Sequence, residues 1–187
     1  MKEINKFFQI VFYLFFAFTV QVESKILSIG NQNAKVIVKV FSSLTCPHCA
    51  DFHAEIFNNL KKDYIDKGLV KFEHHAFPLD LAALNAEIVV RCHKNNEKSF
   101  ELLGEIYEKQ SQWAVGSDIN PINESLKRIG LSSGLNKDSI NGCLNDEKAQ
   151  DLILDERIQA QKKYKIQSTP TIYINEKKYE GNHEYEE

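Results

Sequence analysis

The segment FSSLTCPHCA at residues 41–50 constrains this chain most, because two cysteines flank a proline and a histidine where two predicted elements meet. The run KVIVKVF at residues 35–41 is rich in β-branched side chains and interrupted only by lysines, which predicts a strand covered on both faces. The stretch 50–68 has helical periodicity and ends on a glycine. Cys46 and Cys49 are therefore expected where a buried strand turns into a helix.

The rest of the chain completes an α/β pattern. The helical stretch repeats an apolar side chain every four residues, at Phe52, Ile56, Leu60 and Tyr64. LVKFEHHAFPL at residues 69–79 predicts a second strand, residues 81–164 are patterned as helices, and TPTIYINEKKYEG at residues 169–181 predicts a closing hairpin. The order β-α-β, helical block, β-β predicts an α/β sheet that carries a helical insertion.

The chemistry of the motif follows from its place at the start of the helix. Pro47 suits the first helical position, where a missing N–H costs nothing. A thiolate at Cys46 would face unpaired backbone N–H groups and the positive end of the helix dipole, so its pKa is expected to fall. Cys49 lies one turn deeper and is better shielded, which predicts that Cys46 exchanges with substrates and Cys49 resolves the mixed disulfide. His48, when protonated, is expected to stabilise the thiolate further, and the alternative is an exposed histidine without an electronic role.

A zinc site is a competing interpretation of the same motif. Its candidate ligands are Cys46, Cys49 and two of the four histidines His48, His53, His74 and His75. Structural zinc usually takes a second Cys or His pair at a defined spacing, and Cys92 and Cys143 are too far apart to supply one. We therefore expect no metal. Instead, His53 and His75 are expected on polar faces, and His74 is expected to be a hydrogen-bonded interior histidine.

The first 24 residues, MKEINKFFQIVFYLFFAFTVQVES, resemble a removable secretory signal. They combine a lysine-bearing start, an apolar run at residues 7–20 and a small residue, Ser24, where cleavage is expected. The run of 14 residues is shorter than the roughly 20 needed to cross a bilayer. An uncleaved membrane anchor is the alternative. Either way, the remaining chain is expected outside the cytoplasm, where disulfides persist.

Charge and cysteine number narrow the function further. The formal net charge of −3 offers no basic field for nucleic acid. All four cysteines follow the leader, and an even number fits two bridges or none. Cys92 and Cys143 are either buried free thiols or a structural bridge; a bridge closing so long a loop would stabilise the fold by about 4 kcal/mol.

The segment STPT at residues 168–171 directly precedes the apolar strand of the closing hairpin. A proline is tolerated at the first residue of a strand, so Pro170 could simply mark the strand's beginning. The alternative is a cis peptide between Thr169 and Pro170. In that case, nearby backbone polar groups would be left free to pair with an extended substrate.

With C-P-H-C at a strand-to-helix turn, T-P before a later strand and helices between them, the sequence resembles the DsbA family of thiol-disulfide oxidoreductases. The resemblance implies a thioredoxin fold with an inserted all-helical domain. It divides the chain into a signal peptide at 1–24, a thioredoxin-like domain at 25–80 and 165–187, and the inserted domain at 81–164. Thioredoxin folds normally close with a helix after the last hairpin, and that helix is expected to be missing from this chain.

The resemblance also assigns roles to individual residues. Cys46 is expected to be the nucleophile and Cys49 the resolving thiol, with Pro47 and His48 completing the catalytic motif. Pro170 is expected to be the cis-proline that faces them, with Thr169 beside it in contact with substrate. A second pair, here Cys92 and Cys143, is similar to the arrangement in some alphaproteobacterial members and is expected to form a structural disulfide.

The implied function is that of a periplasmic protein-disulfide oxidoreductase that donates its disulfide to reduced, unfolded secreted proteins. The implied partners are these proteins and a quinone-linked membrane oxidase of DsbB type that restores the disulfide. The expected state is a monomer without cofactor. Two alternatives stay open: a disulfide isomerase or reductase, and a non-catalytic binding module in which C-x-x-C is a structural bridge or a metal site.

Overall fold

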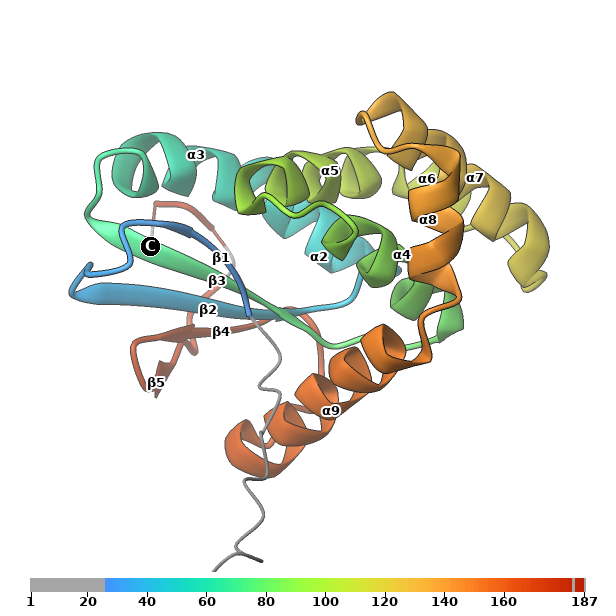
Figure 1. Ribbon diagram of the computed structural model, residues 1–187. Coiled ribbons are helices and arrows are strands. Elements are labelled where there is room, and N and C mark those ends of the chain that lie inside the picture. The colour runs from blue at the N-terminus through green and yellow to red at the C-terminus, as the bar shows by residue number, and fades with distance from the viewer. Residues whose placement is uncertain (1–25, 183, 187) are drawn as a thin grey trace, which may run out of the picture.

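The computed structural model of the protein describes residues 26–182 and 184–186, so the predicted leader lies outside the described residues. Five strands form one mixed sheet in the order β1-β3-β2-β4-β5 (Figure 1). Their bounds are β1 Leu27–Gly30, β2 Val36–Ser42, β3 Val70–Ala76, β4 Thr171–Ile174 and β5 Lys177–Lys178. β2 and β3 are parallel and joined by a helical crossover, whereas β1 and β4 pair antiparallel to them. The predicted β-α-β unit and closing hairpin are therefore confirmed.

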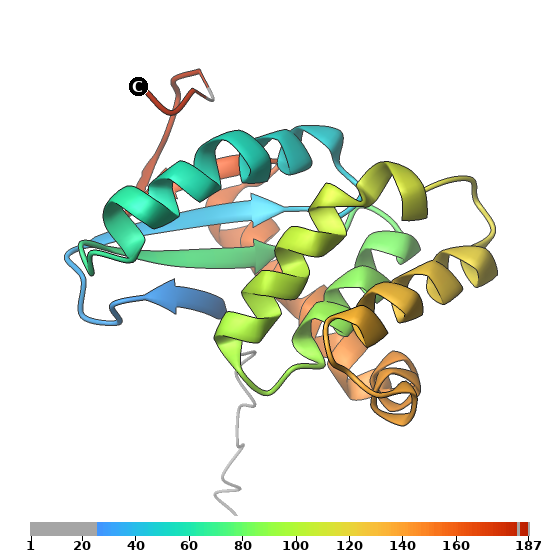
Figure 2. The same ribbon diagram turned by 90° about the horizontal axis from the view of Figure 1, so that it is seen from above.

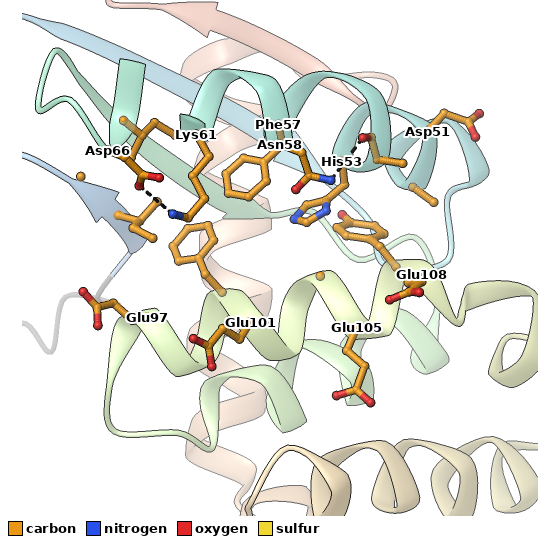
Figure 3. Close-up of a pocket in the computed structure, with 18 residues that line it drawn as sticks. Asp51, His53, Phe57, Asn58, Lys61, Asp66, Glu97, Glu101, Glu105 and Glu108 are labelled. Atoms are coloured by element: carbon orange, nitrogen blue, oxygen red, sulfur yellow. Dashed lines mark hydrogen bonds and ion pairs between the residues drawn. The ribbon is translucent and has the colours of Figure 1, made fainter. Parts of the chain in front are cut away.

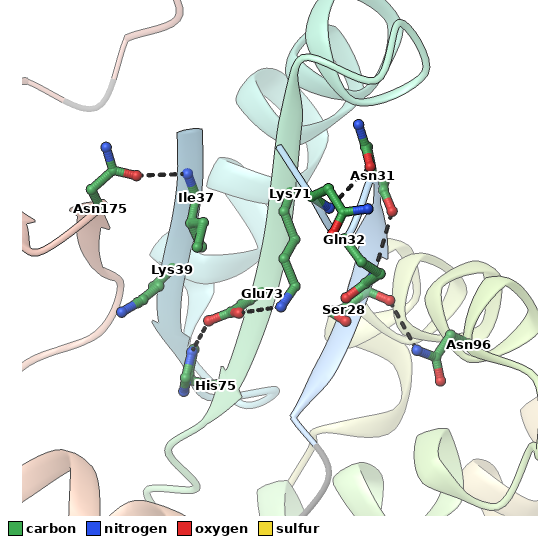
Figure 4. Close-up of polar contacts among 12 residues, drawn as sticks. Ser28, Asn31, Gln32, Ile37, Lys39, Lys71, Glu73, His75, Asn96 and Asn175 are labelled. Atoms are coloured by element: carbon green, nitrogen blue, oxygen red, sulfur yellow. Dashed lines mark hydrogen bonds and ion pairs between the residues drawn. The ribbon is translucent and has the colours of Figure 1, made fainter. Parts of the chain in front are cut away.

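The edge strand β1 was not predicted. It has only four residues and pairs with β3 in the register Leu27 to His74. Its sequence, LSIG, is too short to show a period of two. Side-chain amides add two contacts to the sheet: Asn96 donates to the Ser28 carbonyl of edge strand β1, and Asn175, between β4 and β5, accepts from the Ile37 N–H of β2 (Figure 4).

The helix after the motif differs from a regular α-helix. It runs through α2 Pro47–Phe52, η1 His53–Phe57, α3 Asn58–Leu60 and η2 Lys61–Ile65, where η marks π-helical segments. The predicted spacing of four placed Tyr64 on the buried face, but Tyr64 is 45% exposed while Phe57 and Ile65 are buried. Each π-helical turn takes in an additional residue, so the buried face shifts along the sequence.

The predicted helical block is present between β3 and β4. It comprises α4 Leu81–Arg91, α5 Asn96–Glu108, α6 Gln110–Trp113, α7 Ile119–Ser132, α8 Lys137–Leu144 and α9 Glu147–Tyr164. Short polar side chains cap several of these helices; the Asp80 carboxylate, for example, accepts from the Ala83 N–H at 2.7 Å. Figures 1 and 2 show α5 beside the motif helix on one face of the sheet and α9 across the other face.

Apolar side chains fill both faces of the sheet. The larger cluster lies between the sheet, the motif helix and α4, α5 and α7, and includes Phe57, Phe72 and Phe100. A smaller cluster under α9 joins Phe41 and Tyr173 of the sheet to other buried side chains. None of the helices in residues 26–182 and 184–186 combines the length and apolarity needed to cross a membrane.

Buried charges join the sheet to the helical block. The His74 imidazole of β3 bonds the Glu87 carboxylate of α4, so the predicted interior histidine is confirmed. Arg91 ion-pairs with Glu87 at 3.4 Å and with Glu156 of α9 at 2.8 Å. Glu156 in turn accepts from the backbone N–H of Ala76, the last residue of β3, at 2.8 Å. Because removing one partner of a buried ion pair is costly, this network fixes α4 and α9 to the strand that ends beside the motif.

Candidate active site

Cys46 and Cys49 lie at the turn from β2 into the motif helix. Cys46 is the N-cap residue, with extended φ and ψ, and Pro47 opens α2. The two cysteines are 7% and 1% exposed, and both carry free thiols, so the structure is that of the reduced dithiol. The difference in exposure leaves Cys46 as the sulfur that a second molecule can reach.

A side chain from the helical block fixes this turn. The Gln110 amide of α6 is buried and donates to the Leu44 carbonyl at 2.8 Å and to the Cys46 carbonyl at 3.1 Å. Sequence reasoning missed Gln110, because nothing in its surroundings separates it from a solvated polar residue. Thr45, also missed, donates its hydroxyl to the Asp80 carboxylate at 2.8 Å. The motif turn is therefore held from two directions by residues that follow β3.

The loop before β4 faces the motif. The peptide between Thr169 and Pro170 is cis, and the Cys46 sulfur is 3.3 Å from the Thr169 carbonyl oxygen, to which its protonated form donates. The Thr169 hydroxyl is buried and has no hydrogen-bond partner among the described residues. A hydroxyl can always donate, so this group is available to a sulfur that has lost its proton. The structure thus brings together Cys46, Cys49, Thr169 and Pro170.

The two thiols differ widely in acidity. The Cys49 thiol, bonding the Cys46 sulfur, does most to lower the pKa of Cys46 to about 5. Thr169 and the backbone N–H groups of His48 and Cys49 lower it further, against the opposing effect of burial. Burial, with the bond to Cys46, raises the pKa of Cys49 far above the usual thiol range. Cys46 is therefore a thiolate at neutral pH and Cys49 a thiol.

The His48 side chain lies in solvent. It is 83% exposed, and its Nδ1 is 3.8 Å from the Asp51 carboxylate. Its backbone N–H, not its imidazole, is the group that lowers the pKa of Cys46. An electronic role for the imidazole stays a prediction, and its exposure limits the size of any such effect.

Two of the histidines considered as zinc ligands lie elsewhere than predicted. His53 is buried between the rings of Phe57 and Tyr107, because the π-helical turn rotates it inward. His75 is also buried; it packs on Phe41 and bonds Glu73 at 3.0 Å (Figure 4). The prediction of polar-face positions for both is wrong. Within the described part of the chain, no cluster of three or more His, Cys, Asp or Glu side chains has a metal-binding arrangement.

The second cysteine pair lies in the helical block. Cys92, the C-cap residue of α4, forms a disulfide with Cys143 of α8, with an S–S distance of 2.09 Å. The bridge joins residues 51 positions apart. The prediction that an even number of cysteines gives two bridges or none does not describe this state, in which one bridge is closed and the motif pair is open.

Comparison with known proteins places these features in a family. The family model described as Thioredoxin matches residues 22–187. The chain is 30% identical over 171 residues to disulfide bond formation protein D of Bacillus subtilis, covering 85% of this chain and 72% of that protein. It is 32% identical over 161 residues to a Rickettsia bellii protein named provisionally as a protein-disulfide oxidoreductase, covering 86% of this chain and 61% of that protein. The chain thus spans less than two thirds of the length of this relative.

Solved structures agree in fold. The crystal structure of alpha-DsbA1 from Wolbachia pipientis superposes with a TM-score of 0.79 at 29% identity, covering 87% of this chain and 86% of that one. Oxidised BdbD from Bacillus subtilis superposes with a TM-score of 0.76 at 24% identity, covering 86% and 87%. The similarity therefore extends over both the sheet and the inserted helices.

Proposed function

Since the chain belongs to the thioredoxin family, in its DsbA-like branch with a helical domain inserted into the fold, we propose that it is a protein-disulfide oxidoreductase that donates the Cys46–Cys49 disulfide to reduced secreted proteins. The observation that carries this proposal is the opposed acidity of two neighbouring thiols. A stabilised Cys46 thiolate favours the reduced form of the protein. A protein whose reduced form is stabilised is an oxidant, because it gains free energy by giving its disulfide away.

The first step is attack by a substrate thiolate on the Cys46 sulfur of the oxidised protein. The Cys46–Cys49 bond breaks, a bond forms between Cys46 and the substrate sulfur, and Cys49 leaves as a thiolate that takes up a proton. Both cysteines are buried, but Cys46 is less so, at 7% exposed against 1% for Cys49, which supports attack at Cys46.

The second step releases the product. A second substrate thiolate attacks the substrate sulfur of the mixed disulfide, and Cys46 leaves. The substrate is oxidised by two electrons and the protein is reduced by two. Cys46 is a good leaving group because a thiol of low pKa departs readily. Thr169 and the backbone N–H groups at the helix start stabilise the negative charge on the departing Cys46 sulfur.

The surroundings of Cys46 suit an unfolded polypeptide. The loop at Thr169 and Pro170 lies against the sulfur and borders β4. Leu79 and Leu81 are exposed on either side of Asp80, whose carboxylate holds Thr45 of the motif turn. An extended substrate could pair with backbone groups near the cis-proline and place apolar side chains against these leucines. Such contacts depend little on sequence, as an enzyme that acts on many unfolded secreted proteins requires.

The proposal extends to location and partners. The leader at residues 1–24 would direct the chain to the periplasm, and the protein would act there as a monomer. Each cycle leaves a dithiol, so a quinone-linked membrane oxidase of DsbB type would accept two electrons and two protons to restore the disulfide. The free thiols of Cys46 and Cys49 correspond to the form that such an oxidase receives.

The test is oxidation of reduced, denatured ribonuclease by the oxidised protein, followed by recovery of ribonuclease activity. Cys46→Ser and Cys49→Ser should each abolish oxidation, because neither variant can form the Cys46–Cys49 disulfide. Mixed with a substrate that already carries disulfides, Cys49→Ser should accumulate a mixed disulfide through Cys46, because the thiol that would resolve it is missing. The double variant Cys92→Ala, Cys143→Ala is the control, since it removes the two sulfurs outside the motif and should still oxidise. Full activity of Cys46→Ser would exclude Cys46 from the reaction. Absence of oxidation by the unaltered protein would support the binding-module alternative, and strong repair of scrambled ribonuclease would support the isomerase alternative.

A further inference from the structure

A groove separates the motif helix from α5. It encloses about 1250 Å³ and runs from Ile29 and Gly30 of β1 to Asp51, two residues after Cys49. Buried apolar side chains form its floor, among them Phe57, Phe100 and Tyr107. Small residues on both walls keep it open, and a Cβ atom on Gly104 would meet His53 at 3.2 Å.

The walls of the groove are acidic. Four glutamates follow one another along α5, and Asp51 and Asp66 lie on the opposite wall (Figure 3). Its carboxylates are those of Asp51, Asp66, Glu97, Glu101, Glu105 and Glu108, and its only lysine or arginine is Lys61. Removing these six acids and one base from the chain totals of 26 and 23 leaves 20 acidic and 22 basic residues. The residues that line this groove therefore account for the net negative charge of the chain.

Several of these carboxylates lack an internal partner. Lys61 pairs with Asp66 at 2.6 Å, and Glu105 pairs with Lys109. Glu97, Glu101 and Glu108 form no ion pair with another described residue, and all three are exposed. Solvated surface acids are common, so this row alone would not indicate a ligand.

His53 supplies the independent indication. It is 9% exposed, lines the groove, and its Nε2 is buried without a hydrogen-bond partner among the described residues (Figure 3). A buried polar atom without a partner destabilises the folded state, and a bound partner would remove that cost. Stacking on Phe57 and Tyr107 holds the ring in place. Burial, with a smaller effect of His74, lowers the pKa of His53 to about 4, so the ring is neutral at pH 7 and does not repel a cation.

We propose that this groove binds a basic, partly apolar polypeptide segment of a partner or client protein, with its apolar side chains on the aromatic floor and its Lys or Arg side chains against the glutamates of α5. The neutral His53 imidazole would hydrogen-bond the segment through Nε2. Acidic walls select cationic side chains, and the apolar floor selects Leu-like side chains over a purely basic tract. Binding does not involve the thiols, so this proposal stands apart from the oxidase activity.

The test measures the affinity of the full-length reduced protein for a short, cysteine-free, fluorescein-labelled peptide of Lys and Leu. A peptide with Glu in place of Lys and one with Ser in place of Leu are the controls, and both should bind more weakly. Glu101→Gln with Glu108→Gln should weaken binding of the Lys-Leu peptide roughly fivefold, and more at low salt, since it removes two exposed ion pairs.

The matched control variant is Asp151→Asn with Asp155→Asn, which neutralises two exposed acids of α9 outside the groove. It should leave the affinity unchanged. Equal weakening by both double variants would overturn the proposal, because it would show a response to net charge alone. His53→Phe keeps the ring stack, and unchanged affinity in that variant, with its unfolding transition intact, would exclude His53 from the site.

Sedimentation of the same proteins tests whether a second copy of the chain occupies the groove instead. Self-association that disappears in the Glu101→Gln, Glu108→Gln variant would assign the groove to a second copy of the chain and would also overturn the proposal. Ribonuclease oxidation is measured in parallel. It should be normal in both double variants, so that loss of peptide binding and loss of thiol chemistry remain distinguishable.

Discussion

Cys46 and Cys49 lie three residues apart at the start of one helix, whereas Cys92 and Cys143 come from two helices and lie 51 residues apart in the chain. The first pair is surrounded by donors to a thiolate: the Cys49 thiol, Thr169 and backbone N–H groups. The second pair joins α4 to α8 and closes a long loop. Closing a long loop stabilises the folded state, because it removes conformations from the unfolded chain. Stabilising the Cys46 thiolate instead favours reduction of the Cys46–Cys49 disulfide.

The difference shows that cysteine chemistry depends on which state the surroundings stabilise. Around Cys46, hydrogen-bond donors stabilise the reduced state, so the bridge is suited to transfer. For Cys92 and Cys143, closing a long loop favours the disulfide, so this bridge is expected to stay oxidised.

The largest expected effect is on the acidity of Cys46. Its rate of alkylation by iodoacetamide, measured on the reduced protein, should titrate with a midpoint near pH 5, whereas Cys49 should not react near neutral pH. Because the pKa of Cys46 is depressed, stabilisation of the reduced form is complete above the ordinary thiol pKa of 9.0 and is lost as the pH falls through about 5. A midpoint near the ordinary thiol value would remove the physical basis of the oxidase proposal.

The next effect is on stability. Cys92→Ala with Cys143→Ala should lower the free energy of unfolding by about 4 kcal/mol, as expected for opening a loop of this length, and urea unfolding measures it. The alkylation midpoint of Cys46 should not move. A shifted midpoint would show that the Cys92–Cys143 disulfide affects the acidity of Cys46, so that the two cysteine pairs are not independent.

A smaller effect is expected at Thr169. Replacement by Val removes the buried hydroxyl that is available to the Cys46 thiolate and should raise the pKa of Cys46 by about one unit. Thr169→Ser is the matched control, because it keeps the hydroxyl. If Val and Ser variants titrate alike, the hydroxyl has no part in stabilising Cys46.

The smallest effect is expected at His48. His48→Ala should raise the pKa of Cys46 by a few tenths of a unit and make the protein a slightly weaker oxidant, since the imidazole is 83% exposed and the backbone N–H remains. His48→Gln separates loss of charge from loss of the side chain. A change as large as that of Thr169→Val would contradict the solvent-exposed position of the ring.

Much of this architecture could be predicted because its signals are local. The β-branched run before Cys46, the helical periodicity after it and the proline at the first helical position are all read within a few residues. The shifted face of the motif helix could not be predicted, because a pattern of four assumes a regular helix and π-helical turns break it. That error also placed His53 on a polar face.

The residues that complete the site come from far along the chain. Gln110 holds the Cys46 carbonyl from 64 residues away, and Thr169 meets the Cys46 sulfur from 123 residues away. Thr169 had a signal, because it precedes a proline at the start of a strand. Gln110 had none, since a glutamine in a helical stretch is as compatible with solvent as with the interior.

The most direct test of the account is a redox equilibrium of the purified protein against a glutathione series, with each cysteine followed by mass-tagged alkylation. Cys46 and Cys49 are expected to equilibrate at a potential near or above that of the glutathione couple, while Cys92 and Cys143 stay bridged throughout. A motif potential below about −300 mV, in the range of structural disulfides, would contradict it and mark Cys46 and Cys49 as a second structural bridge.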